Sequence, residues 1–271
     1  MSERNGFPAG VPCWVDTWQP DADAAMSFYT QIFGWEAEDT MPESTGGKHY
    51  MCRVRGRDVA AIASRPEGAP SVTAWTTYVW VDDVDATVAK AKQAGGRAQV
   101  EPFDALDGGR IAVIADPAGA AIGAWQPGAH KGAQLVNEPG AYSMSGLMTS
   151  DPDGAKRFYP EVFGWEIKAF EMGDDELVMW TVPGYVGGEP QQPVPRDVAA
   201  VMLPASNGNA PQPHWSVDFW IADVDAAAAH VEELGGQILA PPSDVPGTGL
   251  RQGVFMDPQG ASFSLTQPPG V

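Results

Sequence analysis

Two aspartates stand where a carboxylate could accept a proton inside an aromatic pocket. Asp16 lies between Trp14 and Trp18 in a segment whose residues alternate as in a β-strand, so the three side chains share one face. Burial between two indoles raises the pKa of a carboxyl group toward the range of a general base. Asp218 stands in a similar alternating segment of the second half. The alternative reading of Asp16 is an inert acid paired with a backbone donor or an arginine.

Neighbouring strands supply the other side chains expected around these acids. Alternation along 75–81 directs Thr76, Tyr78 and Trp80 inward, and the equivalent later positions are Ser216, Asp218 and Trp220. Tyr78 or Arg110 would stabilise the anion left by proton abstraction, although Arg110 is equally suited to pairing with surface carboxylates. The remaining predicted ligand contacts are Trp125, His49, His214 and Arg251, which is the counterpart of Arg110.

The chain has four histidines, and none share a His-x-His or His-x3-His spacing. The sequence therefore offers no local metal site, and we expect neither a metal nor another cofactor. His130 falls between the two halves and His230 in the middle of a helical pattern, so both are expected at the surface.

The elements that would position these residues occur twice. Asp23-x4-Phe28-Tyr29-x3-Phe33-Gly34-Trp35-Glu36 returns 130 residues later, beginning at Asp153. The segment beginning at Trp75 returns at an offset of 140, and Asp116-Pro117-Ala118-Gly119 returns at 141. The growing offset predicts an insertion in the second copy within Gly184–Pro195. Repeated motifs in an unchanged order indicate a tandem duplication.

Each half divides again into two units with the order βαβββ. In the first unit, apolar residues spaced as on one helix face predict a helix over 23–33, followed by short strands at 35–38, 48–54 and 58–64. In the second, a strand at 75–81 precedes a helix opened by Asp83, then strands at 97–100, 110–115 and 120–125. We therefore predict an α+β fold of four modules. Its domains are 1–127 and 142–271, joined by a linker at 128–141.

In this repeated order, the Phe-Tyr…Phe-Gly-Trp helix end, the Val-Asp-Asp-Val-Asp helix start and the Asp-Pro-x-Gly hairpin resemble the vicinal oxygen chelate superfamily. That superfamily includes glyoxalase I, bleomycin-resistance proteins and extradiol dioxygenases. The resemblance covers 12–127 and 142–268, and extends to a tandem-domain branch described as glyoxalase-like proteins or hydroxylases. It implies curled mixed sheets that enclose small-molecule pockets.

Metal-dependent members of the superfamily carry His, Glu or Gln ligands on particular strands. The resemblance puts the corresponding positions of this chain at Asp16, Thr76 and Gly123 in the first half and at Gly146, Ser216 and Ser264 in the second. Asp16 alone has a ligating side chain among them. A divalent ion held by one carboxylate would be mostly hydrated, so we expect both pockets to be free of metal.

Composition excludes several classes of function. Lys and Arg total 16 against 35 acidic residues, a net charge of −19, which disfavours nucleic acid and anionic membrane surfaces as partners. Two cysteines and the lack of a long apolar run favour a cytoplasmic protein. We expect a monomer or homodimer whose partner is a small organic ligand.

Three functions remain open. The first is a metal-independent isomerase, lyase or tailoring hydroxylase acting on a carbonyl-rich or polycyclic aromatic compound, and we prefer it. The second is a binding protein that sequesters a drug or metabolite, and the third is a metal-dependent glyoxalase or dioxygenase. We expect the functional site in the first half. At the positions of Trp14, Asp16 and Trp18, the second half has Met144, Gly146 and Met148.

Overall fold

The computed structural model describes residues 3–42, 46–69, 71–172, 175–187, 197–203 and 212–270. The first half contains β1 (Pro12–Gln19), α1 (Ala22–Phe33), β2 (Glu36–Asp39), β3 (His49–Val54), β4 (Arg57–Ser64), β5 (Trp75–Trp80), α2 (Val84–Gln93), β6 (Arg97–Ala105), β7 (Gly109–Ala115) and β8 (Ala121–Pro127). The second half contains β9 (Tyr142–Met148), α3 (Pro152–Phe163), β10 (Glu166–Met172), β11 (Asp175–Thr181), β12 (Val198–Met202), β13 (His214–Trp220), α4 (Val224–Glu233), β14 (Gln237–Asp244), β15 (Arg251–Met256) and β16 (Ser262–Gln267). Most of the predicted insertion lies outside the described residues.

The predicted helices begin and end on their capping residues. The Asp21 carboxylate accepts a hydrogen bond of 3.0 Å from the backbone of Ala24, and Gly34 ends α1 in the left-handed region at φ 67°. Asp151 and Gly164 do the same for α3, with φ 71° at the glycine. A left-handed residue with no Cβ stops a helix without strain, so both copies turn into the next strand at the same point.

Each half forms one open, mixed eight-stranded sheet. The strand order is β2-β3-β4-β1-β5-β8-β7-β6 in the first sheet and β10-β11-β12-β9-β13-β16-β15-β14 in the second. Within a module the first and last strands are parallel, as in β1 with β4, and the two modules of a half join through the antiparallel pair β1 and β5. The sheets therefore pair modules within each half, and the predicted α+β fold of four βαβββ modules is confirmed.

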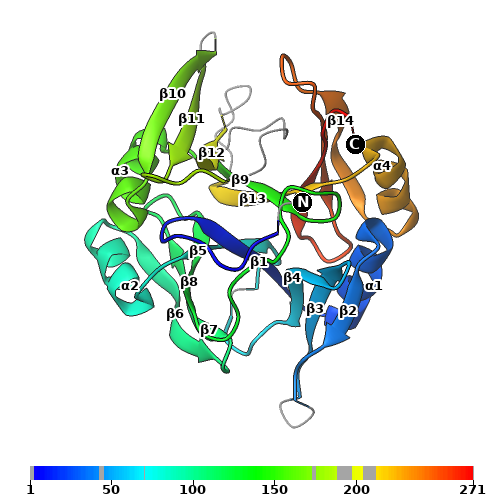
Figure 1. Ribbon diagram of the computed structural model, residues 1–271, viewed down its shortest axis with the longest axis horizontal. Helices are drawn as coiled ribbons and strands as arrows, with labels where there is room; N and C mark the ends of the chain where they lie inside the picture. The colour runs from blue at the N-terminus through cyan, green and yellow to red at the C-terminus, as the bar shows by residue number, and fades with distance from the viewer. Residues whose placement is uncertain are drawn as a thin grey trace.

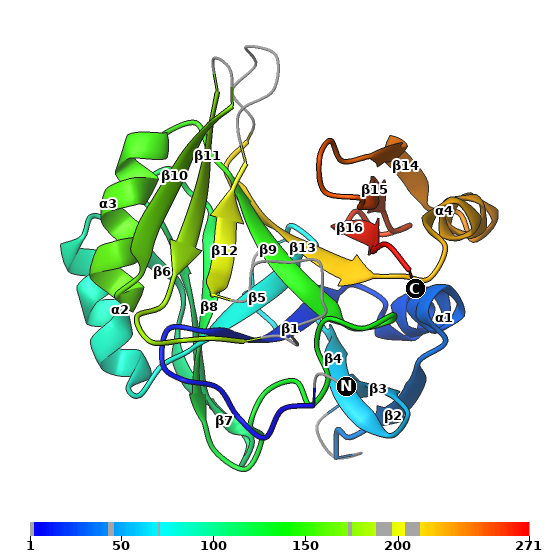
Figure 2. The ribbon, with the colours of Figure 1, turned by 45° about the horizontal axis from the view of Figure 1, so that its top comes forward.

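The helices pack across the two halves. Figures 1 and 2 show α1 beside α4 on one flank of the molecule and α2 beside α3 on the other. The Tyr29 hydroxyl of α1 donates to Asp257 of the second half at 2.8 Å, and the Tyr159 hydroxyl of α3 donates to Asp116 of the first at 2.9 Å. The two repeats thus hold one another by equivalent buried hydrogen bonds. In the described part of the chain, no helix combines the length and apolar character needed to cross a bilayer.

Candidate active site and ligand cavity

Asp16 is a buried carboxylate on β1. The residue is 8% exposed, its Oδ2 accepts a hydrogen bond of 3.2 Å from the Tyr78 hydroxyl, and its Oδ1 is buried without a hydrogen-bond partner among the described residues. Burial raises the pKa of Asp16 from 3.8 to about 7, and the nearby polar hydrogens of Tyr78 and Trp18 lower it by less. A carboxyl group with a pKa near 7 can give or take a proton at neutral pH.

Tyr78 fills the space beside Asp16. Its ring lies over Gly123 of β8, where an added Cβ would stand 2.2 Å from the ring carbon Cδ1. Tyr78 and Gly123 are partners in the parallel pair of β5 with β8, so the ring occupies the volume that any side chain at position 123 would need. The ring is fully buried, and its hydroxyl orients the Asp16 carboxylate.

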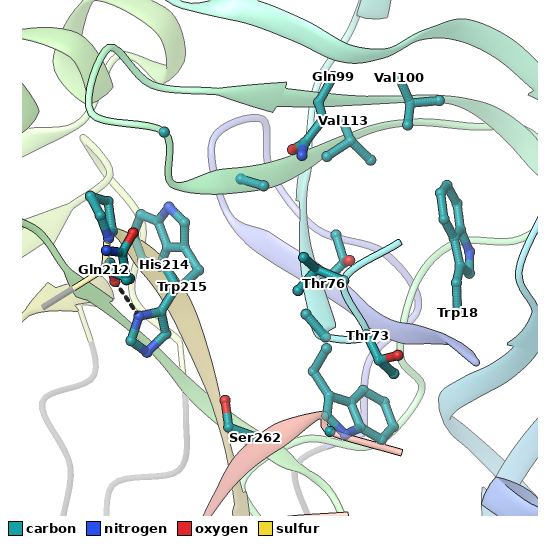
Figure 3. A pocket seen from close by; sticks show the side chains of 17 residues that line it. Trp18, Thr73, Thr76, Gln99, Val100, Val113, Gln212, His214, Trp215 and Ser262 are labelled. Atoms are coloured by element: carbon teal, nitrogen blue, oxygen red, sulfur yellow. Dashed lines mark hydrogen bonds between the residues drawn. The ribbon is translucent and has the colours of Figure 1, made fainter. Parts of the chain in front are cut away.

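A cavity of about 520 Å³ lies between the two halves (Figure 3). Equivalent segments of both repeats line it, namely residues 72–76 with 212–215, Gly119 with Gly260 and Ala121 with Ser262. Further lining residues come from the first half alone, namely Trp18, Gln99, Val100 and Val113. The volume falls in the range of roughly 300–1,000 Å³ that is usual for small-molecule sites. Figure 3 shows Trp18 at one end, across Thr76 from Gln212 and His214 at the other.

Thr76 connects this cavity to Asp16. The two residues are directly opposite in the antiparallel pair of β1 and β5, so their Cβ atoms lie about 5 Å apart on one face of the sheet. Trp18, two residues along β1, shares that face. Because Thr76 and Trp18 both line the cavity, Asp16 lies one side chain behind its wall.

His214 is at the opposite end of the cavity. Its Nδ1 lies 2.7 Å from the backbone carbonyl of Gln212. A carbonyl oxygen only accepts, so Nδ1 carries a proton in this contact. Trp18, Thr76 and His214, predicted for two separate pockets, thus line one cavity. Sequence reasoning missed Gln99, because no pattern placed its strand beside the other half.

The second acid, Asp218, is engaged on both oxygens. Oδ1 accepts from the Thr266 hydroxyl at 2.7 Å and from Gln252 at 3.2 Å, while Oδ2 accepts from the Ser143 hydroxyl. Burial raises the pKa of Asp218 to about 7, and the three donors lower it by less. Ser216 is also engaged, donating to the Gly146 carbonyl at 3.1 Å. The protein itself therefore satisfies the polar groups predicted for the second pocket.

The two predicted arginines do not approach either acid. Arg110 stands three positions before the cavity-lining Val113 on β7, so alternation places it on the opposite face of the sheet. There it donates to Asp85 of α2 at 2.7 Å and to Asp104 of β6 at 3.0 Å. Arg251 makes the equivalent ion pairs in the second half. Both arginines fasten a hairpin strand to the first turn of a helix, which is the surface pairing weighed as the alternative.

The remaining predicted aromatic contacts lie either close to Asp16 or in the packed core. Trp125 packs edge-on against Tyr78, with ring centroids 6.2 Å apart, so it lies close to Asp16. Trp80 packs against the chain start, 6.4 Å from Phe7, and Trp220 is 3% exposed. His49 is half-buried on β3, where its Nδ1 lies 2.8 Å from the Thr40 hydroxyl and burial lowers its pKa.

His130 is not the surface residue that the sequence suggested. Its ring packs edge-on against Trp14 at 4.4 Å and Trp125 at 5.4 Å between centroids. Burial lowers the pKa of His130 to about 4, so the ring is neutral at physiological pH. The linker folds back over the strand ends, because the His130 amide donates to the Gly108 carbonyl at 3.0 Å. A linker has no periodic pattern from which this burial could be predicted.

Two open mixed sheets, each built from a pair of βαβββ modules, define the vicinal oxygen chelate class of fold. Residues 14–123 match the family model of the glyoxalase/bleomycin resistance protein/dioxygenase superfamily, and residues 132–266 match that of the glyoxalase-like domain. The chain belongs to the glyoxalase/bleomycin resistance protein/dioxygenase superfamily.

Relatives match along nearly the whole chain. The chain is 40% identical to "Putative glyoxylase CFP32" of Mycobacterium bovis, over 99% of this chain and 98% of that protein. It is 34% identical to "Anthracycline biosynthesis protein DnrV" of Streptomyces peucetius, over 96% and 94% of the two chains. Among solved structures, the Mn(II)-bound glyoxalase from Novosphingobium aromaticivorans is similar in fold, with a TM-score of 0.61, 20% identity and coverage of 96% of this chain and 82% of that one.

The residues of this chain do not fit a metal ion such as the Mn(II) of the glyoxalase that is similar in fold. Among the described residues there is no group of three or more His, Cys, Asp or Glu side chains that could hold an ion. At the first-half positions that the resemblance associates with ligands, Gly123 has no side chain and the Tyr78 ring covers it. Thr76 has a neutral hydroxyl, which leaves Asp16 alone. We therefore derive no chemical step through a metal.

Proposed function

We propose that this chain is a metal-independent enzyme that removes a proton next to a carbonyl group of a small aromatic compound bound in the cavity. The observation that supports this is the state of Asp16. Its carboxyl group has a pKa of about 7 and an oxygen, Oδ1, with no partner among the described residues, and it lies directly behind Thr76 of the cavity wall. Most buried carboxylates are satisfied by the protein, as Asp218 is, so the unpartnered oxygen points to a role with a ligand.

The chemistry is a proton transfer that needs no redox partner. Through one bridging water, Asp16 Oδ1 takes a proton from the carbon next to the carbonyl, and the electron pair of that C–H bond moves to form an enolate. The Thr76 hydroxyl, on the same wall, is a donor for the enolate oxygen. Returning the proton from Asp16 to a different carbon completes an isomerisation. Tyr78 acts on Asp16 itself, because its hydroxyl donates to Oδ2 and so holds the carboxylate in place.

The shape and lining of the cavity favour a flat ligand. The partly exposed Trp18 contributes an indole surface to it, and such a face stacks on planar rings. A relative that is 34% identical is named for anthracycline biosynthesis, and anthracyclines are polycyclic aromatic compounds with carbonyl groups. We therefore propose an aromatic ketone or a similar carbonyl compound as the substrate class.

Deuterium exchange tests this function without knowledge of the product. The protein is incubated in D2O with a panel of aromatic ketones such as tetralones, and mass spectrometry follows label entering the carbon next to the carbonyl. We expect exchange catalysed by the wild type and by Arg110→Ala, and a loss of at least about 100-fold in Asp16→Asn, the usual scale for a general base. Equal exchange by Asp16→Asn and the wild type would refute the role of Asp16.

A binding protein without catalysis is the second candidate. The cavity favours it independently of Asp16, because the Trp18 indole and a few polar groups are sufficient to retain a flat molecule. In that case a ketone of the panel quenches tryptophan fluorescence and binds stoichiometrically, with no deuterium incorporation in any variant.

A further inference from the structure

The cavity between the halves has no acidic lining in a strongly acidic protein. The chain carries 35 Asp and Glu residues and a net charge of −19, yet none of the 17 described residues that line the cavity is an Asp or a Glu. Elsewhere on such a surface an anion would be repelled by the net charge. The lining therefore admits a negatively charged ligand at a place where the rest of the molecule would resist one.

Arg65 provides a positive charge at the edge of this cavity. Its Nη2 donates to the Thr73 hydroxyl at 2.6 Å, and Thr73 is a cavity residue that is 8% exposed. The Nε of Arg65 is buried without a hydrogen-bond partner, and in the described ranges of the chain Arg65 makes no ion pair with a carboxylate. Arg53 and Arg110, by contrast, each contact two carboxylates.

A half-buried guanidinium without a counter-ion is unusual, because desolvation of its charge is not offset by a nearby anion. An acid group on a ligand would supply that offset through charge-assisted hydrogen bonds, for which the guanidinium geometry is well suited. The rest of the lining is indole, aliphatic and neutral polar, so the remainder of such a ligand would be aromatic.

We propose that the cavity binds an aromatic organic anion whose acid group pairs with Arg65 at the Thr73 edge. This inference rests on the proposed function for the location of the ligand, and it names the ligand class of that site. The shared chemistry is a flat ring system bearing one carboxylate, sulfonate or ionised phenol. Arg65, and not Arg110, is then the arginine that contacts the charge of the ligand.

Two fluorescent probes of nearly equal shape test the charge preference. Anilinonaphthalene sulfonate carries one negative charge, and N-phenylnaphthylamine has the same aromatic frame without it. We expect the wild type to bind the sulfonate at least about tenfold more tightly than the amine. Arg65→Gln removes that preference, whereas Arg157→Gln, which deletes an exposed arginine of α3, retains it. Tenfold corresponds to about 1.4 kcal/mol, a modest value for a charged hydrogen bond.

Two further variants locate the site and control for folding. Ala74→Trp places an indole in the cavity from an exposed lining position and is expected to weaken both probes. Arg65→Lys keeps the charge and is expected to retain part of the preference. Equal sulfonate affinity in Arg65→Gln and the wild type overturns the proposal, as does unchanged binding of both probes by Ala74→Trp. Loss of ketone exchange in Asp16→Asn with intact sulfonate preference separates this site from the Asp16 chemistry.

Discussion

Replacing Asp16 by Asn should remove a loss of stability that the wild-type protein suffers as the pH rises toward 8. The pKa of Asp16 is about 7 in the folded protein, against 3.8 for an ordinary aspartate. Between these values the folded chain holds a proton that the unfolded chain has released, so the free energy of unfolding falls as pH rises through this range. Above pH 7 the whole loss is present. Asn cannot ionise, and its amide oxygen still accepts from the Tyr78 hydroxyl.

The size of the effect follows from the two pKa values. Each tenfold difference in proton affinity is worth about 1.4 kcal/mol, so ionising buried Asp16 costs about 4 kcal/mol in total. Two pH units of this loss lie between pH 5 and 7, which is about 3 kcal/mol. The amide nitrogen of Asn lacks a partner where Oδ1 was, but that cost is the same at every pH. The stability of Asp16→Asn relative to wild type should therefore rise by about 3 kcal/mol between pH 5 and pH 8.

Urea unfolding of both proteins at a series of pH values measures this difference. Asp218 titrates with the same pKa in the two proteins, so its contribution cancels in the comparison. Asp82→Asn, which removes an exposed carboxylate, controls for the change in net charge and should show no such trend. A stability difference that stays constant from pH 5 to pH 8 would show that Asp16 is not held protonated by burial.

Two further predictions concern the packing around the site and between the halves. Gly123→Ala should destabilise the protein by about 1–3 kcal/mol, because the new Cβ would stand 2.2 Å from the buried Tyr78 ring. Gly146→Ala, with 3.1 Å to a flexible side chain, should cost less in the same urea experiment. Tyr29→Phe and Tyr159→Phe should each cost about 1–3 kcal/mol, because each removes a donor to a buried carboxylate of the other half. A measurable loss in only one of the two tyrosine variants would contradict their structural equivalence.

The order of the elements could be read from the sequence because its signals are local. A helix expected over 23–33 is found at Ala22–Phe33, since Asp21, the apolar spacing and Gly34 act within a few residues of one another. Strand ends were less well determined. The strand expected at 97–100 extends to Ala105, because pairing with β7 continues past the alternating segment.

The candidate site depended on tertiary structure to a greater extent. Alternation along β1 and β5 correctly placed Asp16, Thr76 and Tyr78 on one face, because side-chain direction in a strand is a property of the chain itself. The same reasoning did not settle the outcome for Arg110, since its carboxylate partners belong to α2 and β6 and no local pattern along the chain places those elements beside it.

The sequence by itself thus determined the repeat, the module order and the direction of the strand residues, all of which depend on periodicity and nearby caps. Tertiary structure decided that modules join by hydrogen bonds within a half while their helices pack across halves, which brings residues 72–76 against 212–215. It also decided the burial of His130 and the position of Arg65 beside Thr73. The physical reason is that contacts between two similar halves depend on the summed fit of whole surfaces, and no local pattern along the chain records that fit.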